Sequence, residues 1–460
     1  MSAPSAEHAP EQTTALVQAS PAPLADISPG RPLLLALAAW MTVGLAASVW
    51  PTAVGVWAAV GAGVLAIVLG DLTALLRTPT PVVTRSLPHA LALGEWHPVK
   101  VRLEHSGPRE LEVEVVDALP DNVRGQGLPR RVRISPGKWV AFEWKLRPIE
   151  RGEFTLPWME LRLRSPMGFL RHRRRVLQST EARVYPNFKA VSRFALMAVD
   201  NRVAELGVHT RRRRGQGLEF MQLREYREGD PLRQIDWKAV SRRNQLISRE
   251  YREEQNQQVV FLLDCGRRMR PRDGELSYFD HVLNAVLLLS YVALRQGDAV
   301  GTFTFSGVDR WLPPRKGRGA MNVLLNGVFD IHPTTAPSDF AEAATRIATR
   351  VKRRALVILV TNLRDDDAEE LPLALAPLRR KHLVLVASLR EPAIEAALDT
   401  PIHDLKEAVR VAAAHDYLGA RRKAHELARA RGMQTLDVLP GQLPVALVNR
   451  YLDIKRSGLL

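Results

Sequence analysis

The sequence predicts three structured parts: a transmembrane helical hairpin, an antiparallel β-sandwich and a doubly wound α/β domain. Three patterns lead to this fold class. An uncharged stretch covers residues 32–70, apolar and charged residues alternate between residues 80 and 186, and apolar strands alternate with helices after residue 257. The chain has 460 residues, of which 46% are hydrophobic, and it is therefore long enough to build several cores.

The N-terminal pattern is typical of a membrane anchor. No charged residue occurs between Arg31 and Asp71, and these 39 residues exceed the roughly 20 that one spanning helix needs. We therefore predict two helices, Leu33–Val49 and Thr52–Leu69, with a turn near Trp50. A hairpin places both ends on one side, and the arginines that follow it favour the cytoplasmic side of the cell (inner) membrane.

The flanks and glycines of this segment complete the prediction. Residues 1–31 are rich in Ala, Pro, Ser and Glu and are expected to be a disordered tail, whereas residues 32–71 form the hairpin. Trp40 lies in the middle of a predicted span, where the sequence does not explain it. Four glycines are expected to allow close helix contact: Gly44, Gly55, Gly61 and Gly63.

Residues 80–186 have the period of half-buried strands. Apolar and charged side chains alternate over residues 98–104, 111–115, 139–144 and 161–164, with Pro and Gly turns between them. Several short strands at this spacing predict a β-sandwich of immunoglobulin-like shape. No catalytic constellation occurs here, so we expect a spacer or docking module.

Residues 257–460 alternate between strands and helices, which predicts a parallel sheet covered by helices on both faces. Ligands of such sheets bind beyond the carboxyl ends of the strands, which places Asp264 and Asn362 on the functional edge. The predicted strands are Val259–Asp264, Ala299–Phe305, Ala355–Thr361, Leu383–Leu389 and Thr435–Val438. The predicted helices are Phe279–Arg295, Met321–Phe329, Asp339–Arg350 and Leu405–Arg431.

Residues 187–256 carry a distinctive motif in which glycines, acids, arginines and aromatic residues alternate. Arg–carboxylate pairs are expected to fix its geometry as a cap on the C-terminal domain. We interpret Asp230 and Asp236 as partners of Arg224, Arg233 and Arg242. The motif consists of Gly215, Gly217, Glu219, Phe220, Leu223, Arg224, Tyr226, Gly229, Asp230, Arg233, Ile235, Asp236 and Trp237.

This motif closely resembles the signature of the domain of unknown function 58 family. The resemblance implies a membrane-anchored protein with a von Willebrand factor A-like domain over residues 257–460. It also implies a partnership with a MoxR-type AAA+ ATPase in the maturation or remodelling of protein complexes. The motif would then either brace the von Willebrand A-like domain or present its docking edge.

The resemblance further implies a metal-ion-dependent adhesion site, built from Asp-x-Ser-x-Ser, a later Ser or Thr, and a later acid. In this chain Asp264 is retained, but Gly266 and Arg268 replace the serines and an amide replaces the acid. The degenerate candidates for such a site are Asp264, Thr335, Ser338 and Asn362.

The chemistry of this set argues against a metal ion. Mg²⁺ prefers hard oxygen ligands with carboxylate charge, and the loop offers one carboxylate, one amide and two guanidinium groups. We therefore expect no tight metal site and no cofactor. An alternative hypothesis is that Arg267 or Arg268 partly replaces the metal by pairing with Asp264.

Enzymatic signatures are missing from the sequence. It contains no Gly-x-x-x-x-Gly-Lys-Ser/Thr phosphate loop, no His-Glu-x-x-His and no Cys/His cluster. The single cysteine, Cys265, follows a buried strand and is expected to be a packed apolar residue, with a reactive thiol as the alternative. We predict that the protein is not an enzyme.

Arginines form the most prominent charged cluster, in a chain of net charge +16. The run Arg211, Arg212, Arg213 and Arg214, preceded by Arg171–Arg175, is interpreted as a solvated linker or as a contact with anionic lipid. We expect no dedicated nucleic-acid module, because no recognisable fold motif accompanies the arginines. The predicted function is that of a membrane-anchored assembly factor, and the alternative is a tethered binder of nucleic acid or anionic lipid.

Overall fold

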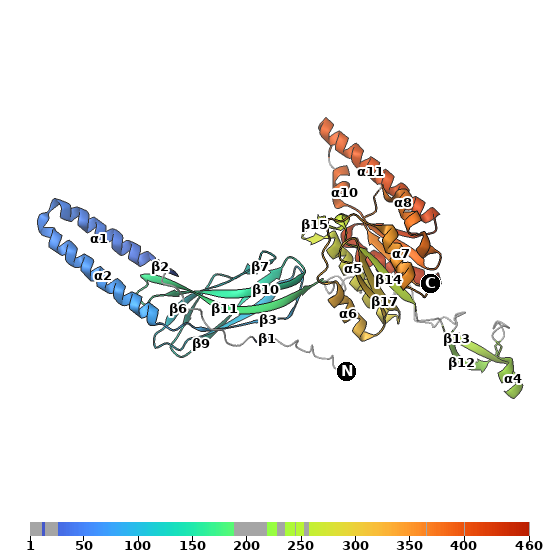
Figure 1. Ribbon diagram of the computed structural model, residues 1–460, viewed down its shortest axis with the longest axis horizontal. Coiled ribbons are helices and arrows are strands. Elements are labelled where there is room, and N and C mark those ends of the chain that lie inside the picture. The colour runs from blue at the N-terminus through green and yellow to red at the C-terminus, as the bar shows by residue number, and fades with distance from the viewer. Residues whose placement is uncertain are drawn as a thin grey trace. The chain divides into compact units, whose positions relative to one another are not determined.

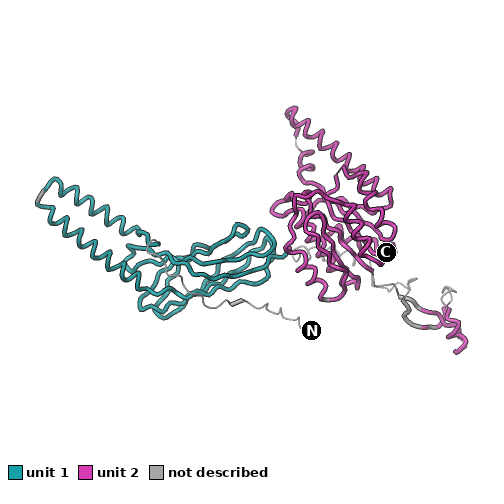
Figure 2. The backbone as a smooth tube through the Cα atoms, viewed as in Figure 1, with its two compact units in different colours: residues 1–185 teal, residues 186–460 magenta. Residues whose placement is uncertain are grey.

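The computed structural model describes residues 12–13, 26–187, 219–227, 235–243, 245–252, 257–364, 366–399 and 401–459. The chain divides into two compact units, residues 1–185 and 186–460 (Figure 2). Most of the predicted disordered tail lies outside the described residues.

The first unit begins with two apolar helices. They are α1 (Arg31–Val49) and α2 (Val54–Arg77), joined by the 3-10 turn η2 (Pro51–Ala53) (Figure 1). Each is long and apolar enough to cross a membrane, and only 6% and 11% of their most apolar windows are buried. The prediction of two apolar helices is confirmed. Helix α2 continues past the predicted end at Leu69, because its last turns pack on the sandwich.

A tryptophan pair holds the two helices together. The rings of Trp40 and Trp57 stack with centroids 4.9 Å apart, and Trp40 Nε1 donates to the carbonyl of Trp57 at 3.1 Å. A Cβ on Gly61 would lie 2.7 Å from Trp40, and one on Gly44 would lie 2.7 Å from Trp57. These two glycines therefore make room for the rings, which explains the mid-span tryptophan. Two other glycines face open space, contrary to prediction: Gly55 and Gly63.

Two antiparallel sheets form the rest of the first unit, as predicted. One has the strand order β1-β3-β5-β9-β7, and the other has β2-β11-β10-β6-β8, with β4 parallel to β11. The immunoglobulin-like shape stays a prediction. The strands are β1 (Gln12–Thr13), β2 (Ile27–Pro29), β3 (Val82–Leu87), β4 (Ala90–Ala92), β5 (His97–Glu104), β6 (Leu111–Asp117), β7 (Val123–Gln126), β8 (Arg130–Ile134), β9 (Trp139–Pro148), β10 (Gly152–Arg164) and β11 (Leu170–Tyr185).

A buried ion pair joins the two sheets. Arg85 on β3 is fully buried and donates to Asp117 on β6 at 2.6 Å and to the carbonyl of Leu156 on β10 at 2.6 Å. It also donates to the hydroxyl of Thr180 on β11 at 3.1 Å. Burial raises the pKa of Asp117 to about 6, against the opposing effect of Arg85. The sandwich core thus contains a charged group that the alternating pattern did not reveal.

Asp71 fixes the end of α2 to the sandwich. This residue ends the uncharged stretch but lies inside the helix, where it is only 3% exposed. Its carboxylate accepts hydrogen bonds from Ser165 Oγ at 2.5 Å and from the Met167 amide at 2.9 Å. Asp71, the first charged residue after the uncharged stretch, therefore connects helix α2 to the sandwich.

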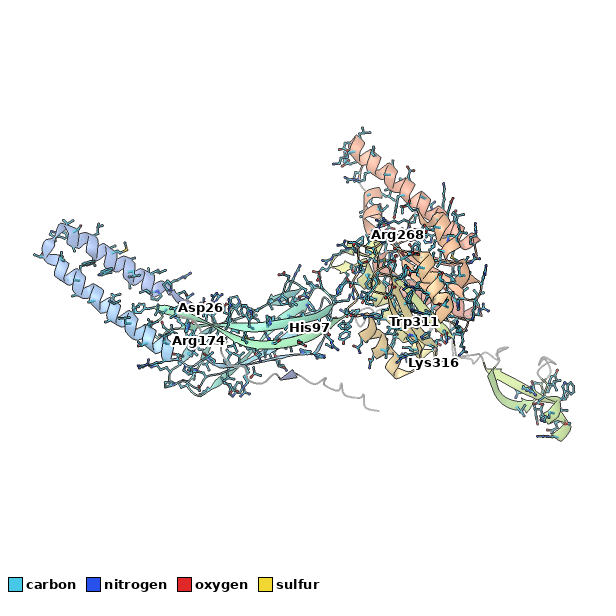
Figure 3. The ribbon with its side chains drawn as sticks, viewed as in Figure 1. Asp26, His97, Arg174, Arg268, Trp311 and Lys316 are labelled. Carbon is cyan, nitrogen blue, oxygen red and sulfur yellow. The ribbon has the colours of Figure 1, made fainter. Side chains whose placement is uncertain are left out.

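Arg174 on β11 closes the last turn of the same helix (Figure 3). It is 7% exposed and donates to the carbonyls of Leu75 at 3.2 Å and Thr78 at 2.7 Å. A guanidinium here adds hydrogen bonds to carbonyls of the last turn, where helix backbone donors run out. The predicted exposed cluster Arg171–Arg175 is therefore wrong in part, because strand alternation turns Arg174 inward.

The second unit contains a six-stranded sheet with the order β18-β17-β14-β19-β20-β21. All neighbours are parallel except β18, which is an antiparallel edge strand that was not predicted. The five predicted strands are found within a residue or two of their predicted limits. The strands are β14 (Gln258–Asp264), β17 (Ala299–Phe305), β18 (Arg310–Arg315), β19 (Leu356–Thr361), β20 (Leu383–Leu389) and β21 (Gln434–Val438).

Helices cover both faces of this sheet and form two cores (Figure 1). One face packs on α5, α6 and α12, and the other packs on α7, α8, α9 and α11. The doubly wound α/β prediction is thus met, although helices α8, α9, α10 and α12 were not predicted. The helices are α5 (Tyr278–Arg295), α6 (Arg318–Val328), α7 (Phe340–Arg350), α8 (Asp367–Ala374), α9 (Ala376–Arg379), α10 (Pro392–Leu398), α11 (Leu405–Ala430) and α12 (Leu443–Arg456).

The described part of the signature motif forms a small element of its own. Strands β12 (Glu219–Glu225) and β13 (Ile247–Arg252) pair antiparallel, and helix α4 (Trp237–Arg243) lies between them in sequence. Ile235 is 8% exposed, whereas Trp237 is 67% exposed. The bracing and docking interpretations of the motif both stay predictions.

Candidate functional site

The candidate site lies at the carboxyl ends of β14 and β19. The chain winds outward in opposite directions from these adjacent strands, and such a reversal point is where open α/β sheets bind ligands. Asp264 is the last residue of β14, and Asn362 directly follows β19. The structure therefore brings both predicted residues to one edge, which we call the carboxyl edge.

Asp264 is fully buried and its carboxylate is held by neutral donors. Oδ1 accepts from the Gly266 amide at 2.8 Å. Oδ2 accepts from Ser338 Oγ at 2.7 Å and from Thr361 Oγ1 at 2.6 Å. Three hydrogen bonds compensate much of the cost of burying this carboxylate.

Of the two predicted loop hydroxyls, only one reaches Asp264. Of these two alternatives, Ser338 makes that contact, whereas Thr335 is exposed. The neighbouring Thr334 instead ties the loop down, donating to the Ser306 carbonyl at 2.7 Å. Sequence reasoning missed Thr361, although a polar residue closing an unbroken apolar strand was a usable signal.

Arg268 does not pair with Asp264, so the substitution hypothesis is wrong for Arg268, and for Arg267 it stays a prediction. Its guanidinium is largely buried and pairs with Asp367 at the start of α8 (Figure 3). The same group lies 3.4 Å from the carbonyl of Asn362 and 5.7 Å from the ring centre of Phe340. The groups that donate to Asp264 are instead two hydroxyls and one backbone amide.

Asn362 also faces away from Asp264 and belongs to a second polar cluster. Its Nδ2 donates to Glu391 at 2.7 Å, and its Oδ1 accepts from Arg421 at 3.0 Å. Arg421 is 1% exposed and also binds Asp437 at 2.7 Å. Tyr417 completes the cluster by donating to Glu391 at 3.0 Å. The family resemblance had implied that Asn362 and Asp264 belong to one site. The structure instead places Asn362 with Glu391 and Arg421.

The expectation of no tight metal site at this edge stays a prediction, and the surroundings of Asp264 bear on it. A Cβ on Gly266 would lie 2.8 Å from the Ala336 carbonyl and 3.0 Å from Asp264 Oδ1, so a serine cannot stand there without rearrangement. Both oxygens of the one central carboxylate already accept protein hydrogen bonds. Within the described ranges, no three His, Cys, Asp or Glu side chains are grouped to hold a metal.

Cys265 is fully buried beside this carboxylate. Its amide donates to the Phe305 carbonyl at 2.9 Å, and its own carbonyl accepts from the Thr334 amide at 2.7 Å. This is the packed apolar position that the sequence predicts, and burial keeps the thiol away from solvent reagents.

A cleft opens on the same edge at the end of β17. Its volume is about 250 Å³, and Phe303 and Phe305 contribute to its lining. Ser306, at its rim, has φ of 62°, a conformation that is uncommon outside glycine and tends to mark functional loops. The acidic residues Asp309, Asp339 and Glu342 and the basic Arg346 also line it.

The signature motif supplies one resolved ion pair. Asp236 accepts from Arg249 at 3.0 Å. It also accepts from the amides of Lys238 and Ala239 at 3.1 Å, so its side chain caps the N-terminus of α4. Arg249 lowers the pKa of this carboxyl. Asp236 thus forms an ion pair with Arg249, which was not among the predicted partners, and the scaffolding role of the motif stays a prediction. Outside the described residues lie Gly215, Gly217, Gly229, Asp230, Arg233 and the basic cluster Arg211, Arg212, Arg213 and Arg214.

A comparison with known protein families finds a match in the second unit. Residues 222–430 match the sequence model of a family described as "Protein of unknown function DUF58". This match agrees with the resemblance over these residues, which make up less than half of the chain. No curated protein matches the chain.

Solved structures show only weak likenesses. An aerotolerance-related membrane protein from Bacteroides fragilis aligns over 43% of this chain and 98% of its own, with 14% identity and a TM-score of 0.28. Salmonella alpha-2-macroglobulin aligns over 23% of this chain and 7% of its own, with 15% identity and a TM-score of 0.18. A PapD-like domain of human CEP192 aligns over 23% and 84%, with 9% identity and a TM-score of 0.17.

Proposed function

We propose that the C-terminal unit is a metal-independent, von Willebrand A-like protein-binding module on a membrane anchor. In this proposal the bulk of the protein lies on the cytoplasmic side of the cell membrane. It works, without enzymatic activity of its own, with a MoxR-type AAA+ ATPase that matures or remodels protein complexes. The family resemblance is the basis for the ATPase partner.

The observation that carries the proposal is that the charged residues at the carboxyl edge are buried and paired, whereas the cleft beside them is open. Asp264, Arg268 and Arg421 are buried and each is held by other protein groups. Beside them lies an open cleft whose volume, about 250 Å³, is below the roughly 300–1,000 Å³ of small-molecule pockets. Such a cleft fits one or two side chains of another protein.

The rim of the cleft indicates the charge of the partner. Three acids and one arginine line it, which gives a net charge of −2 (1 − 3). Arg346 is shared between Asp309 and Glu342, both of which are substantially exposed. We therefore expect a basic segment of the partner to bind here, guided by electrostatic complementarity.

Charge reversal at the rim tests this function. The full-length protein in detergent is mixed with a purified MoxR-type ATPase, and binding is measured by biolayer interferometry with and without Mg²⁺. The variant combines Asp309→Lys with Glu342→Lys. We expect the Kd to rise by about tenfold or more, because opposite-sign complementarity becomes repulsion.

The matched control combines Glu369→Lys with Glu370→Lys on α8. It makes the same charge change at exposed positions that do not line the cleft. Equal loss of binding in both variants would indicate a nonspecific charge effect and contradict the cleft as the docking site. An unmodified protein that does not bind the ATPase at all would contradict the proposed partnership.

A further inference from the structure

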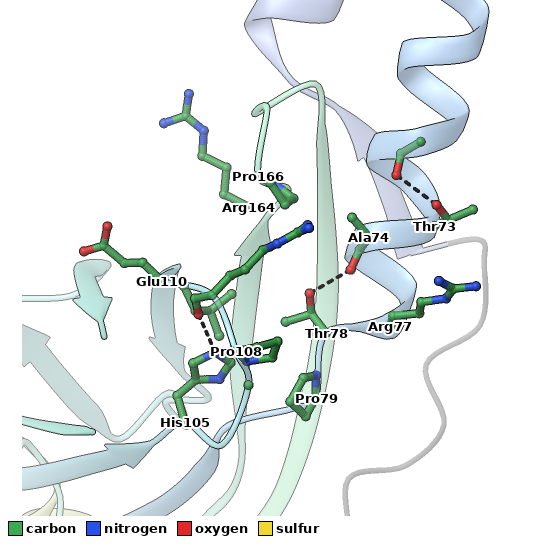
Figure 4. A pocket seen from close by; sticks show the side chains of 14 residues that line it. Thr73, Ala74, Arg77, Thr78, Pro79, His105, Pro108, Glu110, Arg164 and Pro166 are labelled. Carbon is green, nitrogen blue, oxygen red and sulfur yellow. Dashed lines mark hydrogen bonds between the residues drawn. The ribbon is translucent and has the colours of Figure 1, made fainter. Parts of the chain in front are cut away.

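A second cavity lies in the first unit, where α2 meets the sandwich. Its volume is about 380 Å³, within the range of roughly 300–1,000 Å³ typical of ligand sites. One wall is the last turn of α2, with Thr73, Arg77 and Thr78 (Figure 4). The facing wall is the loop of residues 105–111, and Arg164 closes the cavity from β10.

The cavity lies at the level of a membrane surface. Helix α2 starts at Val54, and about 20 residues cross the hydrocarbon core. The helix therefore leaves the core near Thr73, and its last turn, which ends at Arg77, stands among lipid headgroups. Exposed apolar side chains continue along the helix up to Leu69 and Leu76. A headgroup can thus reach the cavity from the bilayer without crossing protein.

The charges on the cavity wall are those of an anion site. The cavity is lined by three arginines and one acid, which gives a net charge of +2 (3 − 1). The arginines are Arg77, Arg109 and Arg164, and the acid is Glu110. Arg164 donates to Glu112 at 3.2 Å, and 45% of its side chain is exposed. Arg77 and Arg109 are both exposed. Guanidinium groups bind phosphate oxygens with paired, charge-assisted hydrogen bonds.

The loop that carries Arg109 is held in place by His105. This histidine is 3% exposed, and its Nε2 hydrogen-bonds to the Arg109 carbonyl at 2.9 Å. A Cβ on Gly107 would lie 2.5 Å from the same ring, so the loop closes tightly around it. Nδ1 of His105 is buried without a hydrogen-bond partner in the structure described. The wall is therefore preformed, and it contains one unsatisfied polar atom.

The negative end of a helix would normally repel an anion, and the structure counters that effect. Arg174 donates to the carbonyls of Leu75 and Thr78, the last acceptors of α2. Its guanidinium offsets the partial negative charge of this end. The carboxylate of Asp71, one turn earlier, is bound by Ser165 and Met167. The arginines therefore dominate the local field.

We propose that this cavity binds the phosphate of an anionic phospholipid headgroup. It is a site distinct from the predicted arginine cluster 211–214 and from the carboxyl edge. A bound headgroup joins α2 to the loop of residues 105–111 and so couples the orientation of the sandwich to the charge of the membrane. Basic residues near a bilayer surface are attracted to anionic lipid.

Thermal unfolding of the detergent-purified full-length protein tests the site. Dioctanoyl phosphatidylglycerol, dioctanoyl phosphatidylcholine and inorganic phosphate are added separately. A ligand that binds the folded state raises the melting temperature in proportion to its binding free energy. We expect phosphatidylglycerol to raise it, and phosphatidylcholine and inorganic phosphate to leave it nearly unchanged.

The Arg77→Gln, Arg109→Gln double variant is expected to lose this shift, with the apparent Kd for phosphatidylglycerol raised about tenfold or more. The control Arg130→Gln, Arg133→Gln removes two exposed arginines of β8 that do not line the cavity and should keep the shift. Arg109→Gln alone, a loop substitution, provides a second test if the double variant does not fold.

Three results would overturn the proposal. An equal shift in the double variant and the control would place lipid binding elsewhere. A shift with phosphatidylcholine equal to that with phosphatidylglycerol would mean that the headgroup charge is not recognised. A shift of the same size with inorganic phosphate would identify a free phosphate ion, and not a lipid, as the ligand.

Discussion

Both units bury arginine–aspartate pairs, but they surround them differently. In the sandwich, Arg85 and Asp117 lie between two sheets, where most backbone carbonyls are used in the strand ladders. In the α/β unit, Arg421 on α11 is buried against the carboxyl ends of β19 and β20, and its partner Asp437 on β21 is half-buried. Arg421 accordingly contacts the carbonyls of Leu363 and Leu389.

The sandwich obtains free carbonyls in another way, through an irregularity. The register of β10 and β11 shifts between Leu156 and Trp158. Arg85 donates to the carbonyls of Leu156 and Gln178 at this bulge. A bulge leaves backbone groups unpaired and so creates a polar pocket inside a sheet. The buried arginines Arg85 and Arg421 therefore lie where the regular hydrogen bonding between strands stops. In the sandwich this happens at a bulge inside the sheet, and in the α/β unit at the strand ends.

The largest effect is expected for Arg421→Met. The substitution leaves Asp437, Asn362 and Ser388 without their buried donor. Breaking a buried pair costs about 3–5 kcal/mol, and the additional acceptors place this variant at the upper end. Urea unfolding of the purified protein measures it, with the exposed neighbour in Arg422→Met as control. A loss below 1 kcal/mol would contradict a structural role for the cluster.

Arg85→Met should cost about 3 kcal/mol near neutral pH and less in acid. Burial already raises the pKa of Asp117 to about 6, so without Arg85 this carboxyl is readily neutralised by protonation. The same urea measurement at pH 5 and pH 8, compared with the exposed Arg133→Met, checks it. An equal loss at both pH values would show that Asp117 stays ionised.

The two units should respond to pH in opposite directions. Burial lowers the pKa of His425 from 6.5 to about 4, so its contribution to stability is present above pH 6.5 and is lost as pH falls towards 4. Asp117 binds a proton in the folded state up to about pH 6 and in the unfolded state only below about 3.8. Its contribution is therefore present in acid and is lost as pH rises towards 6.

Hydrogen exchange of the full-length protein between pH 4 and 7 separates the two contributions, after correction for the intrinsic pH dependence of exchange. Protection of β14 should fall in acid, by up to about 3 kcal/mol, and His425→Phe should reduce that fall. Protection of the β10 amides against exchange should not show this fall in acid. Parallel loss of protection in both units would show that other carboxyls or histidines dominate.

The smallest effect on stability is expected for Trp237→Ala. Because this side chain is 67% exposed, its removal should change the free energy of unfolding by less than about 0.5 kcal/mol. If the motif presents a docking edge, the same variant should weaken binding to the ATPase. A broad loss of stability in thermal unfolding would instead support the bracing interpretation.

Much of the fold could be predicted because hydrophobic pattern is local information. The two apolar helices, the alternating strands and the five parallel strands each follow from neighbouring residues. Strand β18 was missed because Arg310–Arg315 contains two prolines and lies at a sheet edge, where its apolar pattern is weak. Helix α12 was missed although it buries Leu447, Val448 and Tyr451.

The candidate site was predicted less well because its partners are distant in sequence. Asp264 and Ser338 were correctly associated, whereas Thr361 was overlooked and Asn362 was placed beside the wrong group. Arg268 and Asp367 are 99 residues apart, and only the fold of β14 against β19 brings them together. Residue types therefore identified the edge, but not which donor meets which acceptor.

The sequence by itself determined the apolar hairpin, the alternating strands of the sandwich and the winding of the α/β sheet, because burial of apolar surface is encoded by short periodicities. Only the tertiary structure decided the roles of the charged residues. Asp71, Arg85, Arg174 and Arg421 would each be read as solvent-exposed from composition alone. They are buried because strand ends, a bulge and a helix terminus offer them hydrogen-bond partners that no local pattern specifies.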